Sequence, residues 1–183
     1  LLVSDSYVIT NRAVEEMSTL WALLPQNSYD IDAKDELGNK LTVTPESEDG
    51  AIKATITLKT AVKQYETAHF FVVFKLPWKD YISENGWSDF SLNLKLFEPM
   101  NLTVRNLTVT IDLPEGAKFA EFQSSNAAIQ PNIVQMGIYK ETPIFTLSNV
   151  SSYQDLDFTV MYRHAIFWSS FRPTLWTGAL VAV

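Results

Sequence analysis

The residues able to do acid–base or metal chemistry in this sequence are two histidines and 21 carboxylates, with no cysteine. His69 and His164 are far apart in the chain, whereas histidine-based metal sites use two or three histidines at characteristic spacing. The series Asp30, Asp32 and Asp35 lacks the glycine and the terminal glutamate of a calcium loop. We therefore expect structural histidines, acids solvated in turns or on outward strand faces, and neither a metal nor a cofactor.

Motifs of familiar enzymes are missing from the sequence. It contains no G-x-S-x-G element and no glycine-rich phosphate loop, and it has just 6 glycines. A hydrolase with two carboxylates facing each other across a cleft stays open as an alternative, because such a site leaves no motif. The net charge of −7 and the scattered lysines and arginines argue against nucleic acid as a partner. We expect a protein that is not an enzyme.

Hydrophobic residues recur mainly with a period of two, which is typical of half-buried β-strands. The pattern is clearest in four ranges, 51–59, 90–97, 105–113 and 155–162. A fifth range, 68–76, is apolar on both faces and predicts a central strand covered on both sides. Polar turns separate these ranges, among them Asp35–Lys40, which is typical of a hairpin. The sequence predicts an all-β fold, with one short helical turn at 82–87.

A weak boundary falls at Glu98-Pro99-Met100. We predict two packed antiparallel β-sandwich-like lobes, residues 1–97 and a membrane-proximal lobe 98–165, with a single shared core as the alternative. Residues 166–183 then form an aromatic elbow and the start of a transmembrane helix.

Three N-x-S/T sequons mark candidate glycosylation sites at Asn101, Asn106 and Asn149. Asn106 is expected on the outward face of its strand and Asn149 in a turn, where neither glycan would disturb a core. Occupied sequons require an extracytoplasmic domain; ordinary polar residues on a β surface are the other interpretation.

Trp78, Tyr81 and Trp87 cluster in the segment LPWKDYISENGW. Exposed aromatic rings beside polar groups suit sugar stacking or a protein interface, so these three residues are candidate partner contacts. The alternative is a loop that packs its rings down on the core.

The C-terminal ten residues, TLWTGALVAV, carry no charge, although a spanning helix needs about 20 residues. Pro173 suits the first turn of a helix. We interpret this stretch as the first turns of a transmembrane helix, whose membrane-interface residues are Trp168, Phe171, Arg172 and Trp176.

Two features of the sequence favour opposite orientations of this helix. Arg163 and Arg172 favour a cytoplasmic side under the positive-inside rule. The sequons and the acidic composition favour the outside, and we give them more weight. We predict a cell-membrane protein with its domain on the extracytoplasmic side and membrane lipid among its partners.

One segment resembles a known family. NLTVTIDLPEGAKFAEF, residues 106–122, is similar to a strand–LPEGA–strand segment in the membrane-proximal luminal domain of the ribophorin I family of oligosaccharyltransferase subunits. The order of later features also runs in parallel, through TPIFTLSNV, DLDFTVMYRHAIF and an elbow with Pro173. The resemblance covers about residues 91–183. The chain looks shorter than the family and lacks its cytoplasmic portion, like an archaeal or other prokaryotic relative.

This resemblance implies a scaffold that sits beside a catalytic subunit and contributes no catalytic residue. The expected function is an accessory subunit of a membrane protein complex, most specifically an oligosaccharyltransferase acting in protein N-glycosylation. A cell-surface β-sandwich domain that binds carbohydrate or an envelope protein through its aromatic residues is the alternative.

Overall fold

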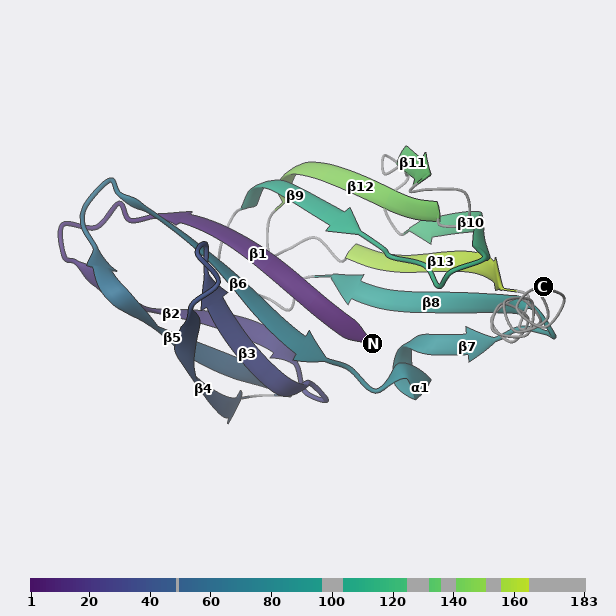
Figure 1. Ribbon diagram of the computed structural model, residues 1–183, viewed down its shortest axis with the longest axis horizontal. Helices are drawn as coiled ribbons and strands as arrows, with labels where there is room; N and C mark the ends of the chain where they lie inside the picture. Colours follow the sequence, from purple (N-terminus) through teal and green to yellow (C-terminus); the bar gives the residue numbers. More distant parts are fainter. Residues whose placement is uncertain (49, 97–103, 125–131, 136–140, 151–155, 165–183) are drawn as a thin grey trace, which may run out of the picture. The chain divides into compact units, whose positions relative to one another are not determined.

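The computed structural model describes residues 1–48, 50–96, 104–124, 132–135, 141–150 and 156–164. Apart from one helical turn, every regular element in these ranges is a β-strand, which confirms the all-β prediction (Figure 1). The described residues divide into two compact units, Leu1–Asp80 and those from Tyr81 onward.

The first unit is one six-stranded antiparallel sheet with the order β1-β6-β3-β4-β5-β2, curved into a half-barrel. Its strands are β1 (Leu2–Thr10), β2 (Met17–Pro25), β3 (Tyr29–Asp35), β4 (Lys40–Glu48), β5 (Ala51–Val62) and β6 (Thr67–Lys75). Strand β4 joins the two halves, because Leu41 pairs with β3 whereas Thr42 and the residues after it pair with β5. The inner faces of the halves supply the core, in which Ile56, Phe70 and Val72 are buried.

Strand β6 lies between β1 and β3, which agrees with the prediction of a central strand. The prediction that both its faces are covered was wrong. Phe70, Val72 and Phe74 are buried, but Phe71 on the opposite face is 38% exposed. A single curved sheet buries its concave side alone, so an apolar residue on the outer face of β6 remains in contact with solvent.

The turn between β3 and β4 has the predicted hairpin geometry. The Asp35 carboxylate accepts hydrogen bonds from the backbone nitrogens of Leu37 and Asn39, at 3.0 and 2.7 Å. Gly38 has a φ of 81°, a left-handed value that a glycine adopts without strain. The hairpin turn from Asp35 to Lys40 was therefore predictable from its turn residues.

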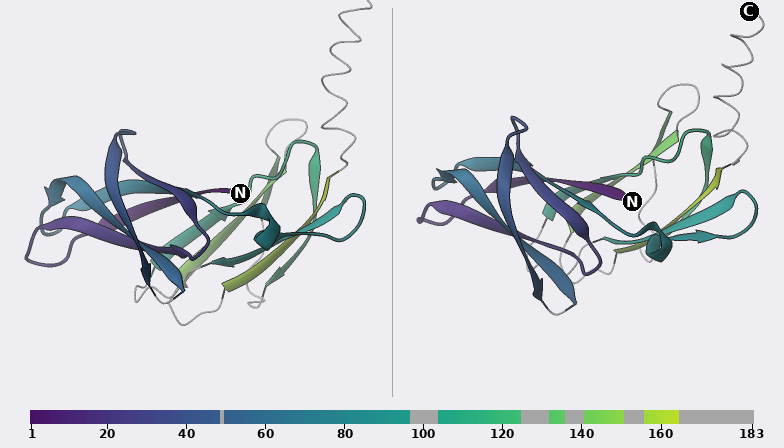
Figure 2. Two further views of the ribbon diagram at one scale, coloured as in Figure 1. Left: turned by 90° about the horizontal axis from the view of Figure 1, so that it is seen from below. Right: turned by 60° about the horizontal axis from the view of Figure 1, so that its bottom comes forward.

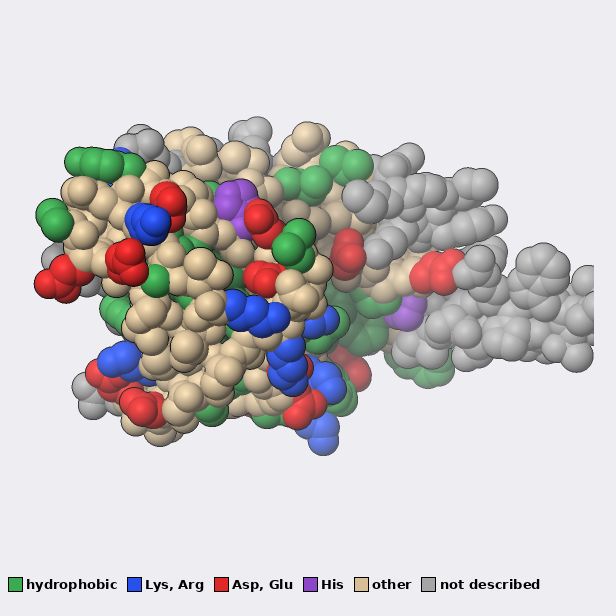
Figure 3. Space-filling model, turned by 60° about the vertical axis from the view of Figure 1, so that its left-hand side comes forward, with side chains coloured by type: hydrophobic (Ala, Val, Ile, Leu, Met, Phe, Trp, Pro, Cys, Tyr) green, Lys and Arg blue, Asp and Glu red, His purple; other side chains and the backbone are tan. Residues whose placement is uncertain are grey.

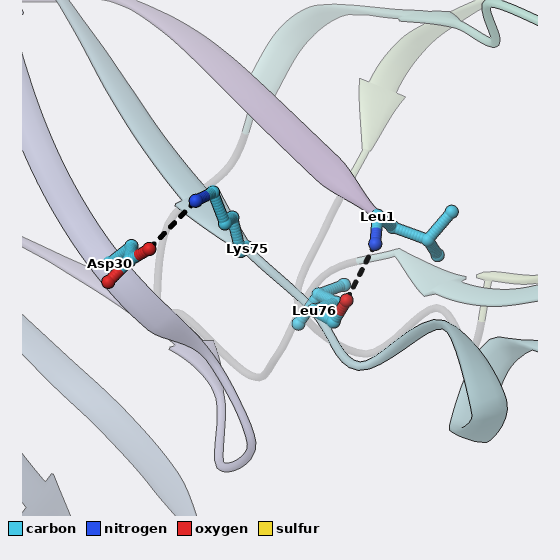
Figure 4. A network of polar contacts seen from close by, with 4 residues as sticks. All are labelled: Leu1, Asp30, Lys75 and Leu76. Carbon is cyan, nitrogen blue, oxygen red and sulfur yellow. Dashed lines mark hydrogen bonds and ion pairs between the residues drawn. The ribbon is translucent and has the colours of Figure 1, made fainter.

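Leu1 extends the pairing of β1 with β6 (Figure 4). Its backbone nitrogen donates to the Leu76 carbonyl oxygen at 2.6 Å, and the Leu76 nitrogen donates to the Leu1 carbonyl oxygen at 2.9 Å. Antiparallel pairs alternate between hydrogen-bonded and non-hydrogen-bonded positions, so the odd-numbered residues of β1 bond to β6. The N–H and C=O groups of Ser4, Ser6 and Val8 then face the edge of the sheet.

The second unit contains two smaller antiparallel sheets, with the orders β10-β13-β8-β7 and β11-β12-β9. Phe145 of β12 joins them, since its ring lies 4.6 Å from the Phe122 ring of β10 and 5.3 Å from the Phe158 ring of β13. These ring contacts join the two small sheets. Its elements are α1 (Trp78–Tyr81, at the boundary), β7 (Ile82–Glu84), β8 (Asp89–Leu96), β9 (Val104–Thr110), β10 (Ala117–Ser124), β11 (Asn132–Gln135), β12 (Glu141–Val150) and β13 (Leu156–His164).

The division between the units lies earlier in the chain than the sequence indicated. The sequence placed it at 97/98, but β7 and β8 belong to the second unit because β8 pairs with β13 from Asp89↔Arg163 to Leu96↔Leu156. The helical turn is also earlier, at 78–81 rather than 82–87. The predicted elbow and helix at 166–183 lie outside the described residues.

Candidate interaction surface

The acidic residues of the β3 region are engaged in local structure. Asp30 forms an ion pair with Lys75 at 2.8 Å, and Asp32 forms one with Lys40 at 2.6 Å. Hydrogen bonding with Asp30 raises the pKa of Lys75, and hydrogen bonds from Asn39 lower the pKa of Asp35. Within the described ranges, no three His, Asp or Glu side chains are grouped closely enough to hold a metal ion.

The two histidines belong to different units. His69 lies exposed on β6 of the first unit, opposite Val8. His164 ends β13 in the second unit, where its Nε2 is 3.2 Å from the Glu115 carbonyl oxygen and its ring contacts Phe90. The structure does not bring them together as a site.

A carboxyl that the sequence analysis did not select lies on the inner face of β1. Burial raises the pKa of Asp5 to about 6, with a hydrogen bond from Tyr7 acting in the opposite direction. Burial and the neighbouring Asp5 carboxylate also raise the pKa of Tyr7, whose ring stacks on Phe70 at 5.0 Å. The inward position of Asp5 was visible in the alternation of β1, which places Asp5 on the same face as Val3, Tyr7 and Ile9.

The aromatic candidates do not form a lid over the core. Trp87 is 97% exposed and Trp78 is 50% exposed, whereas Tyr81 is half-buried. Lys79 holds its ammonium 5.9 Å from the Trp78 ring. Trp78 belongs to the first unit and the other two to the second. These two tryptophans are therefore available for contact with a ligand, a partner or a lipid surface.

Trp87 occupies the tip of the turn between β7 and β8. Glu84 pairs with Phe90, and the Asn85 nitrogen donates to the Asp89 carbonyl oxygen at 2.8 Å, so Gly86, Trp87 and Ser88 form the turn between the two strands. The indole at this tip is almost fully exposed to solvent.

The last described residues of β13 lie directly beside this turn. The His164 nitrogen donates to the Ser88 carbonyl oxygen at 2.8 Å, and the Arg163 guanidinium Nε is 3.1 Å from an Asp89 carboxylate oxygen. The β7–β8 turn and the end of β13 accordingly occupy the same end of the second unit (Figures 1 and 2). The sequence did not indicate this proximity, because the paired residues are more than 70 positions apart.

The sequons differ in what surrounds them. Asn106 is exposed on β9, opposite Ser148, as its strand pattern predicted. Asn149 lies within β12 rather than in the expected turn, because the strand continues to Val150. Asn101 lies outside the described residues, as do all the predicted membrane-interface residues, which are Trp168, Phe171, Arg172 and Trp176.

Charged side chains of both signs are mixed on the face of the first unit that Figure 3 shows. Ion pairs between side chains of this unit include Lys53–Glu48 at 3.2 Å. No helix in the described part of the chain is long and apolar enough to cross a bilayer.

Comparison with protein-family models finds no match for this chain, and comparison with curated proteins finds none either.

Proposed function

We propose that this chain is a non-catalytic, membrane-anchored accessory subunit of a membrane protein complex, with its β-rich units on the extracytoplasmic side. The observation that best supports the proposal is the sequence that follows the end of β13. His164 closes a strand at one end of the second unit, and the 19 residues that follow contain one charge, Arg172, among aromatic and small apolar residues. Such a sequence suits passage from a folded domain into a bilayer.

The exposed Asn106 supports the extracytoplasmic side. Its side chain stands on the wet face of β9, where a glycan can be attached without loss of core contacts. The acidic composition, with a net charge of −7, agrees with this side as well, since cytoplasmic flanks of membrane helices are enriched in lysine and arginine.

The proposed complex is an oligosaccharyltransferase acting in protein N-glycosylation. Support comes from the similarity of residues 91–183 to the ribophorin I family, with its strand–LPEGA–strand segment. In the structure the LPEG residues form the turn that leads into β10, where the Ala117 nitrogen donates to the Pro114 carbonyl oxygen at 2.9 Å. An accessory role agrees with acids that are engaged in turns and ion pairs.

Co-purification tests this proposal. The natural full-length protein, extracted from its own membranes in a mild detergent such as digitonin, is expected to co-elute with a multi-span glycosyltransferase in constant ratio through two chromatographic steps. A protein that runs alone in both steps contradicts the proposal.

A second function is favoured by the exposure of Trp78 and Trp87. Indole rings open to solvent stack on sugar faces and anchor protein interfaces, so a cell-surface domain that binds carbohydrate or an envelope protein is the alternative. Binding to a glycan array that is lost on Trp78→Ala, without any stable membrane partner, would favour this function. Tyr65→Ala is the matched control, because Tyr65 is an exposed aromatic residue far from α1 in sequence.

A further inference from the structure

The end of the second unit at which β13 terminates contains a fully exposed tryptophan. Trp87 is 97% exposed at the tip of a turn whose three residues, Gly86, Trp87 and Ser88, carry no charge. An indole exposed to water gains none of the favourable free energy of burial. Tryptophan is enriched at interfaces where one part of the ring contacts apolar groups and the other contacts water.

Two strand registers place this tryptophan beside the exit of the chain. Asp89 pairs with Arg163 across β8 and β13, and Ala117 pairs with His164 across β10 and β13. The Trp87 turn, the turn at 114–116 and the end of β13 therefore share one end of the sheet (Figure 2).

The chain that leaves this end has the sequence of a membrane-interface segment. Trp168 is four positions after His164 in the sequence. An extended chain spans at most about 3.6 Å per residue, so the predicted aromatic belt begins at most about 14 Å from His164. The predicted interfacial belt therefore begins close, along the chain, to the end of the sheet that carries Trp87.

The charged residues at this end of the sheet include the exposed carboxylates of Glu84 and Glu115. Arg163 and Asp89 neutralise each other as an ion pair at 3.1 Å, and the Asp89 backbone is paired in the strand. The contact is therefore expected to depend on the indole and not on anionic lipid.

We infer that Trp87 inserts into the headgroup region of the bilayer, as a second point of attachment beside the C-terminal anchor. Two contacts at one end of the sheet fix its tilt as well as its height, which one flexible attachment cannot do. This inference rests on the proposed membrane anchor and goes beyond it, since the anchor requires no residue of the β7–β8 turn.

The lack of cysteine makes a direct test available, because a single introduced cysteine is a unique labelling site. We would attach a nitroxide to Trp87→Cys in the full-length chain, reconstituted in phosphatidylcholine vesicles. Collision rates with lipid-soluble oxygen and with a water-soluble nickel complex report the depth of the label. Gln123→Cys is the matched control, being exposed on β10 of the same unit but paired with Thr159, away from the exit.

Trp176→Cys separates this inference from the anchor itself. We expect lipid-like collision ratios at positions 87 and 176 and a water-like ratio at 123. A lipid-like label at 176 with a water-like label at 87 overturns the inference and leaves the anchor standing. Water-like labels at both positions overturn the anchor too. If position 87 is protected in the native complex but water-exposed in vesicles, its partner is a protein, and the inference fails.

Discussion

The hydroxyl of Tyr7 lies 3.4 Å from the carboxylate of Asp5, and both side chains face inward from the first strand of the half-barrel. Strand β1 pairs with β6 on one side and forms the edge of its sheet among the described strands. An inward-pointing acid on an edge strand disfavours the addition of another strand, because the carboxylate would have to be buried further. The Asp5–Tyr7 pair thus protects the β1 edge from pairing with another strand. Strand β1 contains no lysine or proline, the residues that often serve this purpose.

Asp5 makes the stability of the first unit depend on pH. Its pKa is raised from 3.8 to about 6 by burial, so the folded state holds its proton more tightly than the unfolded state does. The extra stability that the protonated Asp5 carboxyl gives the folded state is fully present below about pH 4. It is lost as the pH rises through about 6. Compared with Asp5→Asn, the wild-type free energy of unfolding should therefore fall by roughly 2 kcal/mol between pH 4 and 7.

Urea denaturation across this pH range gives the comparison directly. Parallel pH dependences of the wild type and Asp5→Asn would mean that the carboxyl titrates as it does in water.

Tyr7→Phe separates the hydroxyl from the ring. The substitution keeps the stacking on Phe70, at 5.0 Å, but removes the hydrogen bond that lowers the pKa of Asp5. We expect that pKa to rise further, which the Asp5 carboxyl carbon chemical shift measures in an NMR titration. A pKa that falls in this variant contradicts the assigned role of the hydroxyl.

The core of the second unit depends on Phe145. Its side chain is 0% exposed and contacts rings from two strands of the facing sheet. Phe145→Ala should destabilise this unit by about 3–5 kcal/mol, because it removes the ring and leaves a cavity. Trp87→Ala, which deletes a larger but exposed ring, should leave the midpoint of thermal unfolding unchanged. Similar losses in both variants would show that Trp87 is buried in solution.

Asn106 is a sequon asparagine that the structure shows exposed to solvent. The native protein should carry a glycan there, so intact mass should exceed the sequence mass, and Asn106→Gln should remove the increment without lowering stability. Asn101→Gln and Asn149→Gln serve as controls for the other sequons. A native mass equal to the sequence mass would remove this support for the extracytoplasmic side.

Local patterns predicted local structure well. In β13, Phe158, Val160 and Tyr162 are buried as the period of two predicted, because residues on alternating sides of a strand face opposite surfaces. The Asp35 turn was predictable for the same reason, since its hydrogen bonds join residues four positions apart at most.

Features that depend on distant pairing were not predictable. The assignment of β8 to the second unit follows from its pairing with β13, whose partner residues lie 60 to 74 positions later, and no local pattern encodes that partner. The placement of Trp87 beside the end of β13 has the same origin. Asp5 was missed although its alternation was visible, because a lone acid within a strand is ordinarily assigned to the wet face.

Deletion of the gene in its source cell tests the central claim most directly, with occupancy of N-glycosylation sites measured by quantitative mass spectrometry of envelope proteins. An accessory subunit that presents substrate to a catalytic partner predicts reduced occupancy at many acceptor sites, restored by the wild-type chain, while the catalytic subunit persists in the membrane. Unchanged occupancy at all sites would contradict the account.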